Sequence, residues 1–196
     1  MAEIEIDPLE PGPLTPVEAA ALEALYASAF PEEDLFPLVR RLHAEVPGLV
    51  SLRAMAGETL AGHVIFTPCT IEDLPADHRP NPKTDADAPA QATSAALLGP
   101  LCVAPEHQRQ GIGSALIRAG HEKLRSLEVA HVLVLGDPAY YSRHGFAAGA
   151  DVEPPSPLPE HWRQAWQWLT LDPSLPAPHG SLTVPETWRD PALWTE

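Results

Sequence analysis

Residues 97–114, LLGPLCVAPEHQRQGIGS, contain the pattern from which the fold of the chain can be predicted. An apolar run broken only by Gly99 and Pro100 ends at Val103, and it predicts a strand buried on both faces. A polar turn, residues 104–107, follows, and then a helix predicted over residues 111–127, whose apolar positions recur at helical spacing. A strand, a glycine-containing turn and a helix start are together typical of an anion-binding site.

The beginning of that helix has the chemistry to bind a phosphate. The first backbone N–H groups of a helix lack intrahelical partners and lie at the positive end of its dipole. Gly111 and Gly113 remove the Cβ atoms that would keep a phosphate away from these amides, and Arg109 adds a positive charge. The pattern, Gln-x-x-Gly-x-Gly from Gln108, is neither a P-loop nor the dinucleotide-binding fingerprint.

A second motif lies downstream, where residues 140–146 read YYSRHGF. With the first motif, this segment resembles the GCN5-related N-acetyltransferase (GNAT) superfamily, whose pyrophosphate motif Gln/Arg-x-x-Gly-x-Gly/Ala precedes an aromatic-Tyr-x-x-x-Gly-Phe segment. The resemblance covers residues 95–150. It implies an α/β (α+β) fold with a single mixed, mostly antiparallel sheet that is splayed at its centre and flanked by helices.

The resemblance also implies the activity: transfer of an acetyl group from acetyl-coenzyme A (acetyl-CoA) to the amine of a small molecule or protein, by direct attack in a ternary complex. Tyr141 takes the place of the general acid that protonates the leaving thiolate, although a hydrogen bond to the sulfur or a packing role is the alternative. The family's usual asparagine is replaced by Gly136-Asp137-Pro138, as in an uncharacterised bacterial branch that reads GDPxYYxxxGF. Asp137 or a backbone group is therefore expected to contact the pantetheine arm. The other residues implied to bind the cosubstrate are Leu101, Cys102, Val103, Gln108, Arg109, Gln110, Gly111, Ile112, Gly113 and Ser114. For Gln108, a contact with phosphate and a role in fastening the turn are equally open.

The general base is not evident, because residues 95–103 contain no acid or histidine. Asp137 is one candidate, although a capping role explains it better. His63 is another, although a lone histidine on a strand is more often structural. Glu33 and Asp34 could bind an amine, but they also favour a helix start.

Composition limits the other possibilities. The 196 residues suit one domain, and 44% hydrophobic residues suit a globular one. No apolar run reaches about 18 residues, and the N-terminal sequence does not resemble a secretion signal, so we expect a cytoplasmic protein without a membrane span. The 27 acidic and 12 basic residues give a net charge of −15, which disfavours nucleic-acid binding. Cys69 and Cys102 lack metal-ligand spacing, so no metal site is expected.

The remaining pattern predicts a domain over residues 1–171 and a proline-rich tail, 172–196, that lies on the surface of the domain or on a partner subunit in a possible homodimer. The other predicted elements are strands at 3–6, 49–56, 60–71, 131–135, 146–152 and 165–171, helices at 16–30, 34–45 and 138–144, and an exposed loop at 74–93.

Two other functions fit the sequence. A non-catalytic acyl-CoA sensor or regulatory module would explain the missing base. An enzyme that uses a longer acyl donor or a hydroxyl acceptor is the third interpretation, because the motifs do not identify the acceptor.

Overall fold

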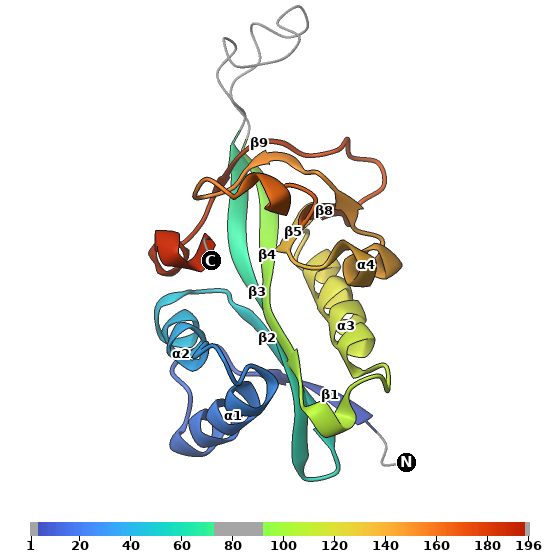
Figure 1. Cartoon of the computed structure of the whole chain (residues 1–196). Coiled ribbons are helices and arrows are strands. Elements are labelled where there is room, and N and C mark those ends of the chain that lie inside the picture. Colours follow the sequence, from blue (N-terminus) through green and yellow to red (C-terminus); the bar gives the residue numbers. More distant parts are fainter. Residues whose placement is uncertain (1–3, 73–91, 195–196) are drawn as a thin grey trace, which may run out of the picture. The chain divides into compact units, whose positions relative to one another are not determined.

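The computed structural model describes residues 4–72 and 92–194 (Figure 1). The strands are β1 (Ile4–Leu9), β2 (Val50–Ala56), β3 (Thr59–Glu72), β4 (Ala92–Val103), β5 (His131–Leu135), β6 (Ala147–Ala148), β7 (Asp151–Glu153), β8 (Trp166–Thr170) and β9 (His179–Thr183). The α-helices are α1 (Pro16–Ala29), α2 (Phe36–Glu45), α3 (Ile112–Ser126) and α4 (Pro138–Tyr141). Short 3-10 helices are η2 (Pro105–His107), η3 (Ser142–His144), η4 (Glu160–Trp162), η5 (Glu186–Trp188) and η6 (Pro191–Trp194).

The described strands form one mixed sheet, in the order β1-β2-β3-β4-β5-β8-β6, and β9 pairs with both β3 and β7. The chain divides into two compact units. The first consists of the chain up to Pro68 together with Leu98–Leu127, and the second of Cys69–Leu97 together with the chain from Glu128 onward. The fold class predicted from the motifs, a mixed sheet flanked by helices, is confirmed.

In the first unit, helices cover both faces of the sheet. Side chains alternate between the faces of a strand, and neighbouring residues of β3 show which helix lies on which face. A Cβ added to Gly62 would meet Ile112 and Leu116 of α3 at 3.1 Å, whereas the side chain of His63 bonds to Tyr26 of α1. Helices α1 and α2 therefore lie on the face opposite α3, as Figure 1 also shows.

Helix α1 begins where the sequence predicts. Thr15 is its N-cap, and the Thr15 hydroxyl accepts from the backbone N–H of Glu18 while the Glu18 carboxylate accepts from the backbone N–H of Thr15. Each side chain satisfies an amide that has no partner within the helix, and Pro16 has no N–H to satisfy. The helix then buries Leu22, Leu25 and Tyr26 against the sheet.

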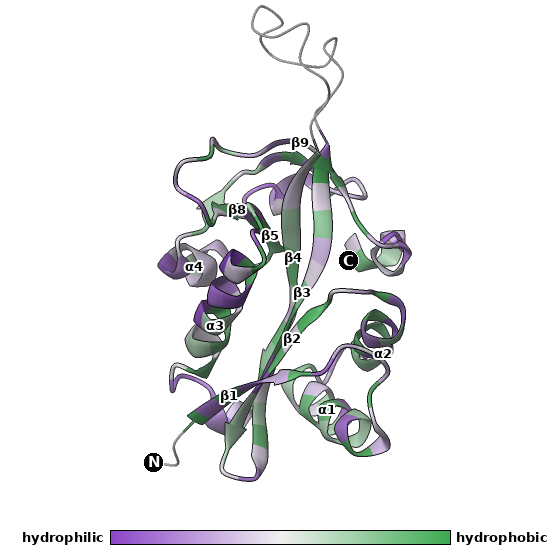
Figure 2. Cartoon of the chain, turned by 180° about the vertical axis from the view of Figure 1, so that it is seen from behind, coloured by the Kyte–Doolittle hydropathy of each residue, from purple (hydrophilic) through white to green (hydrophobic). Residues whose placement is uncertain are grey.

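The core of the first unit is made by β2, β3 and the helix faces that cover them, and Figure 2 shows the strands largely in the colours of apolar residues. The side chains at its centre are fully buried, among them Ala54, Ala61, Val64 and Phe66. Gly120 lets α3 approach this layer, because a Cβ at that position would overlap the ring of Phe66. The close approach fixes α3, and with it the turn that precedes the helix.

In the second unit, β5 and β8 pair antiparallel, from His131 opposite Thr170 to Leu135 opposite Trp166. Strand β9 pairs antiparallel with β3, with Ile71 opposite Leu182, and parallel with β7. This part of the chain is predicted to be a surface tail, but within it His179–Thr183 form a strand of the sheet. Beyond it, Trp194 is buried and donates its indole N–H to the carbonyl of Trp188 at 2.8 Å.

Several predicted boundaries need correction. Helix α2 begins at Phe36, not at residue 34, and Asp34 instead accepts a hydrogen bond from the Phe36 amide at 3.3 Å. The single strand predicted over 146–152 is two short strands, β6 and β7, separated at Gly149, whose φ is 72°. Of the loop predicted at 74–93, residues 92 and 93 belong to β4, and the rest lies outside the described residues.

None of the helices in the described ranges combines the length and the apolar character that a membrane-spanning helix needs.

Candidate active site

The turn between β4 and α3 is fastened by its own glutamines. The side-chain amide of Gln108 donates to the carbonyl of Val103 at 3.1 Å, and that of Gln110 donates to the carbonyl of Glu106 at 3.0 Å. Between them, Arg109 has a φ of 59°, which is uncommon for a residue with a side chain. Gln108 thus fastens the turn, and its contact with phosphate stays a prediction.

The start of α3 leaves a row of backbone amides without intrahelical partners. The first helical hydrogen bond runs from the amide of Ala115 to the carbonyl of Gly111 at 2.9 Å, so the amides of Ile112, Gly113 and Ser114 precede the hydrogen-bonded part of the helix. Gly111 is the N-cap with a φ of 85°, and no side chain caps the helix there. A Cβ added to Gly111 would meet nothing within 4 Å. This helix start is therefore open to an anion.

No acidic residue occupies the first turn of α3, whereas α1 has Glu18 in its first turn. A carboxylate in that turn would compete with a phosphate for the same amides. Arg109 is exposed next to the helix start. The local charge therefore favours a bound anion, although the chain as a whole is acidic.

The end of β4 carries the three residues expected along the pantetheine arm. Leu101 and Val103 are half-buried, and Cys102 is 3% exposed. Burial raises the pKa of the Cys102 thiol to about 12, so the thiol is protonated at neutral pH. The Cys102 side chain is therefore a core group and not a nucleophile.

Tyr141 lies in the second unit, in α4, packed among aromatic rings. Its ring centroid is 5.1 Å from that of Tyr140 and 5.5 Å from that of Phe146, both edge-on. Burial raises the pKa of Tyr141, so its phenol stays protonated at neutral pH and can donate a proton. Gly136 is in close contact with this ring, because a Cβ added at Gly136 would overlap it. Any side chain at position 136 would move Tyr141.

Asp137 caps the short helix that carries Tyr141. Its carboxylate accepts from the backbone N–H of Ala139 at 2.9 Å, and its carbonyl accepts from the amide of Tyr141 at 3.1 Å. Behind it, the buried amide of Gln167 donates to the carbonyl of Gly136 at 2.9 Å. The segment Gly136-Asp137-Pro138 thus orients Tyr141 through α4. Gly145, with a φ of 86°, ends the turn that follows.

A chain of buried polar side chains in the first unit was not predicted. The Tyr26 hydroxyl bonds to Nδ1 of His63 at 2.9 Å, Nε2 of His63 bonds to the Ser51 hydroxyl at 2.8 Å, and that hydroxyl bonds to Nε2 of His43 at 3.0 Å. All four residues are at most 2% exposed. They come from α1, β3, β2 and α2, so no local motif signals them.

Burial lowers the pKa of His63 to about 3 and also lowers that of His43, so both imidazoles are neutral at neutral pH. Both nitrogens of His63 are already hydrogen-bonded, which leaves none to accept a proton from an amine. Of the base candidates, His63 is therefore structural, Asp137 caps α4, and Asp34 accepts a hydrogen bond from the Phe36 amide. Glu33 is exposed.

The comparisons with known proteins agree with this geometry. The family description "Acetyltransferase (GNAT) domain" matches residues 82–148. The chain is 36% identical over 147 residues to "Uncharacterized N-acetyltransferase YjhQ" of Escherichia coli, which covers 72% of each protein. It is 28% identical over 140 residues to "Uncharacterized N-acetyltransferase YhbS" of the same species, over 69% of this chain and 71% of that one. The chain therefore belongs to the GNAT family of N-acetyltransferases.

Solved structures show the same fold. The crystal structure of Escherichia coli YhbS in complex with CoA superposes with a TM-score of 0.72 at 24% identity, over 97% of this chain and 94% of that one. A GNAT acetyltransferase from Brucella melitensis in complex with acetyl-CoA gives a TM-score of 0.65 at 24% identity, over 95% of this chain and 99% of that one.

Proposed function

We propose that the chain transfers the acetyl group of acetyl-CoA to the amine of a small molecule or protein. The observation that carries this proposal is the open start of α3, with its unpartnered amides, its Gly111 N-cap and no acid in its first turn. Membership of the GNAT family, and the CoA and acetyl-CoA in the two similar crystal structures, support acetyl-CoA as the cosubstrate. A cytoplasmic location and a homodimer remain predictions.

In the proposed reaction, the pyrophosphate binds the amides of Ile112, Gly113 and Ser114, with Arg109 as an additional cation. The backbone of residues 101–103 binds the pantetheine arm and donates an N–H to the thioester oxygen, where negative charge develops. The neutral amine attacks the thioester carbon, and the C–S bond breaks. The Tyr141 phenol donates its proton to the departing thiolate, while the proton of the new amide nitrogen leaves to water or to a base.

A negative charge introduced at the start of α3 tests the proposed acetyl-CoA site. Gly113→Asp places a carboxylate where the phosphates are proposed to bind, and we expect acetyl-CoA affinity to fall at least 10-fold, measured by isothermal titration calorimetry. An acid in the first turn stabilises a helix, so weaker binding would not come from an unfolded α3. Gly113→Asn is the control of equal size without the charge.

Equal affinities of Gly113→Asp and the unaltered protein would contradict the proposed phosphate site. The transfer itself is measured by incubating the protein with acetyl-CoA labelled in the acetyl group and a library of amines. An acyl-CoA sensor, the alternative function, would bind acetyl-CoA and transfer no label to any acceptor.

A further inference from the structure

The second unit contains a cavity that the proposed reaction does not use. Its volume is about 800 Å³, within the range of small-molecule sites. It is lined by β7, by the segment between β7 and β8, and by Gly180 of β9. The cavity has charged groups of both signs and an apolar part, which restricts the ligands that fit it.

The carboxylates come from β7. Side chains alternate along a strand, and Val152 is 2% exposed, so Asp151 and Glu153 share the opposite, exposed face. The Glu153 carboxylate is held in place because it accepts a hydrogen bond from the Ser181 hydroxyl at 2.8 Å. Two carboxylates on one wall favour a cationic group such as an ammonium.

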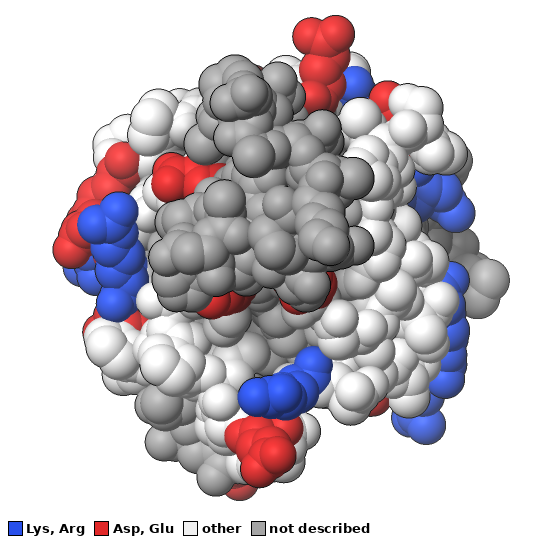
Figure 3. Space-filling model, turned by 90° about the horizontal axis from the view of Figure 1, so that it is seen from above, with Lys and Arg blue, Asp and Glu red and all other residues white. Residues whose placement is uncertain are grey.

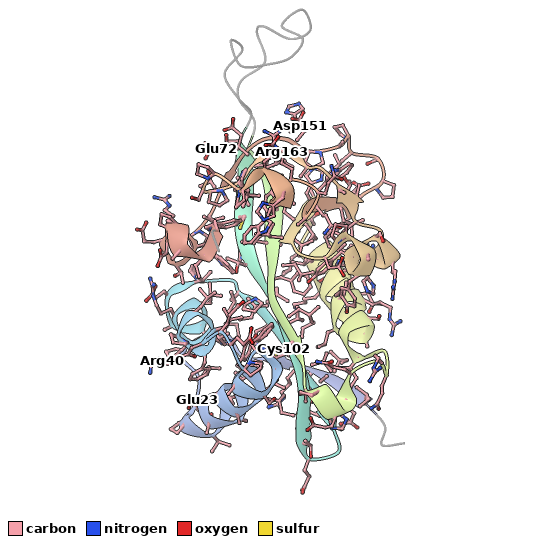
Figure 4. The ribbon with its side chains drawn as sticks, in the orientation of Figure 1. Glu23, Arg40, Glu72, Cys102, Asp151 and Arg163 are labelled. Atoms are coloured by element: carbon pink, nitrogen blue, oxygen red, sulfur yellow. The ribbon has the colours of Figure 1, made fainter. Side chains whose placement is uncertain are left out.

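The cation on the wall is Arg163, which follows η4. Figure 4 labels Arg163 and Asp151, which lie close to each other in that view and line the same cavity. Within residues 4–72 and 92–194, no carboxylate forms an ion pair with Arg163. A guanidinium presents a planar set of donors that matches a carboxylate. Arg163 is therefore available to an anionic group.

A side-chain hydrogen bond and the pairing of two strands hold the walls of the cavity in place. The Trp166 indole N–H donates to the carbonyl of Val152 at 2.7 Å, and Val152 lies opposite Gly180 in the parallel pairing of β7 with β9. Pro154 and Leu158 also line the cavity and add apolar surface to it. Such surface accommodates a short chain of methylene groups.

We propose that this cavity binds a small zwitterion: an ω-amino acid whose ammonium contacts Asp151 and Glu153, whose carboxylate contacts Arg163, and whose methylene chain crosses the apolar wall. The inference goes beyond acetyl transfer. Binding is measured without acetyl-CoA, so failure of this proposal leaves the proposed enzyme function untouched.

The test uses the full chain and isothermal titration calorimetry with glycine, 4-aminobutanoate and 6-aminohexanoate, each compared with hexylamine and hexanoate. We expect one of the three amino acids to bind at least 10-fold more tightly than both singly charged compounds. Arg163→Gln should reduce its affinity at least 10-fold, and Asp151→Asn combined with Glu153→Gln should do the same. All three substituted side chains are exposed, so the fold should be retained.

Arg40→Gln is the matched control, since Arg40 is an exposed arginine of α2 that does not line the cavity. The proposal is overturned if no amino acid binds more tightly than hexylamine and hexanoate. It is also overturned if Arg163→Gln and Arg40→Gln leave the same affinity.

Discussion

Tyr141 is the residue on which catalysis is expected to depend most. We expect Tyr141→Phe to lower kcat for acetyl transfer about 100-fold, because loss of a positioned proton donor costs about 10² to 10⁴ in rate. Its acetyl-CoA affinity should stay unchanged, since the proposed phosphate contacts involve α3. The measurements are steady-state kinetics with a labelled acetyl donor, and calorimetry for the affinity.

The neighbouring ring provides the control for that experiment. Tyr140→Phe removes a hydroxyl from the same short helix α4 and should leave kcat within a few-fold of the unaltered enzyme. Equal kcat values for Tyr141→Phe and the unaltered protein would show that Tyr141 only packs against Phe146 and Gly136.

At the scale of an element, β9 depends on one glycine. Gly180 has a φ of 130°, and a Cβ there would overlap the carbonyl oxygen of Glu72 on β3. Gly12 has a similar φ of 120° with nothing within 4 Å of its added Cβ. Gly12→Ala should therefore cost only the backbone strain, about 1–3 kcal/mol of unfolding free energy. Gly180→Ala should cost more, because it adds the overlap with β3.

Urea denaturation of both variants measures this difference. Hydrogen exchange should show faster exchange of β9 amides in Gly180→Ala only. If the two variants lose equal free energy of unfolding, β9 does not depend on this close approach.

At the scale of the whole molecule, the buried His43 and His63 should make the free energy of unfolding fall at acidic pH. Their pKa values are lower in the folded protein than the ordinary 6.5, to about 3 for His63, so the unfolded chain binds more protons at mildly acidic pH. Stability that is present above pH 6.5 is therefore lost as the pH falls toward 3. The contribution of His63 approaches about 1.4 kcal/mol per pH unit.

Urea denaturation at several pH values between 7.5 and 4.5 tests this expectation. His63→Gln should flatten the dependence of unfolding free energy on pH, whereas His161→Gln, at an exposed position, should leave it unchanged. An unchanged slope in His63→Gln would contradict the assignment of acid sensitivity to this residue.

The surface of the whole molecule bears on its partners. Figure 3 shows Lys and Arg side chains scattered over the visible face, with Asp and Glu side chains also on that face. The net charge of −15 disfavours binding to a polyanion.

The sequence was sufficient to predict the features that depend on interactions between residues close together in the chain. The glycines at the start of α3, the capping box of α1 and the Gly145 turn each depend on residues only a few positions apart, so the pattern is sufficient to predict them. Strand β9 is short and lies between prolines, and only its pairing with β3 and β7 makes it a strand. The hydrogen-bonded series Tyr26–His63–Ser51–His43 and the cavity beside Arg163 each bring together residues that are far apart in the sequence. No single motif can signal such an arrangement.

The four hydrogen-bonded side chains beneath α1 and α2 constrain how this protein can change. Replacing His63 alone with an apolar residue would leave the buried Tyr26 and Ser51 hydroxyls without this partner, whereas replacing all four together would remove the donors and acceptors of the series at once. Single apolar substitutions at positions 26, 43, 51 and 63 should therefore be selected against, whereas combined ones should be tolerated. A library randomised at these four codons and selected for folding would yield either the original set or an entirely apolar one.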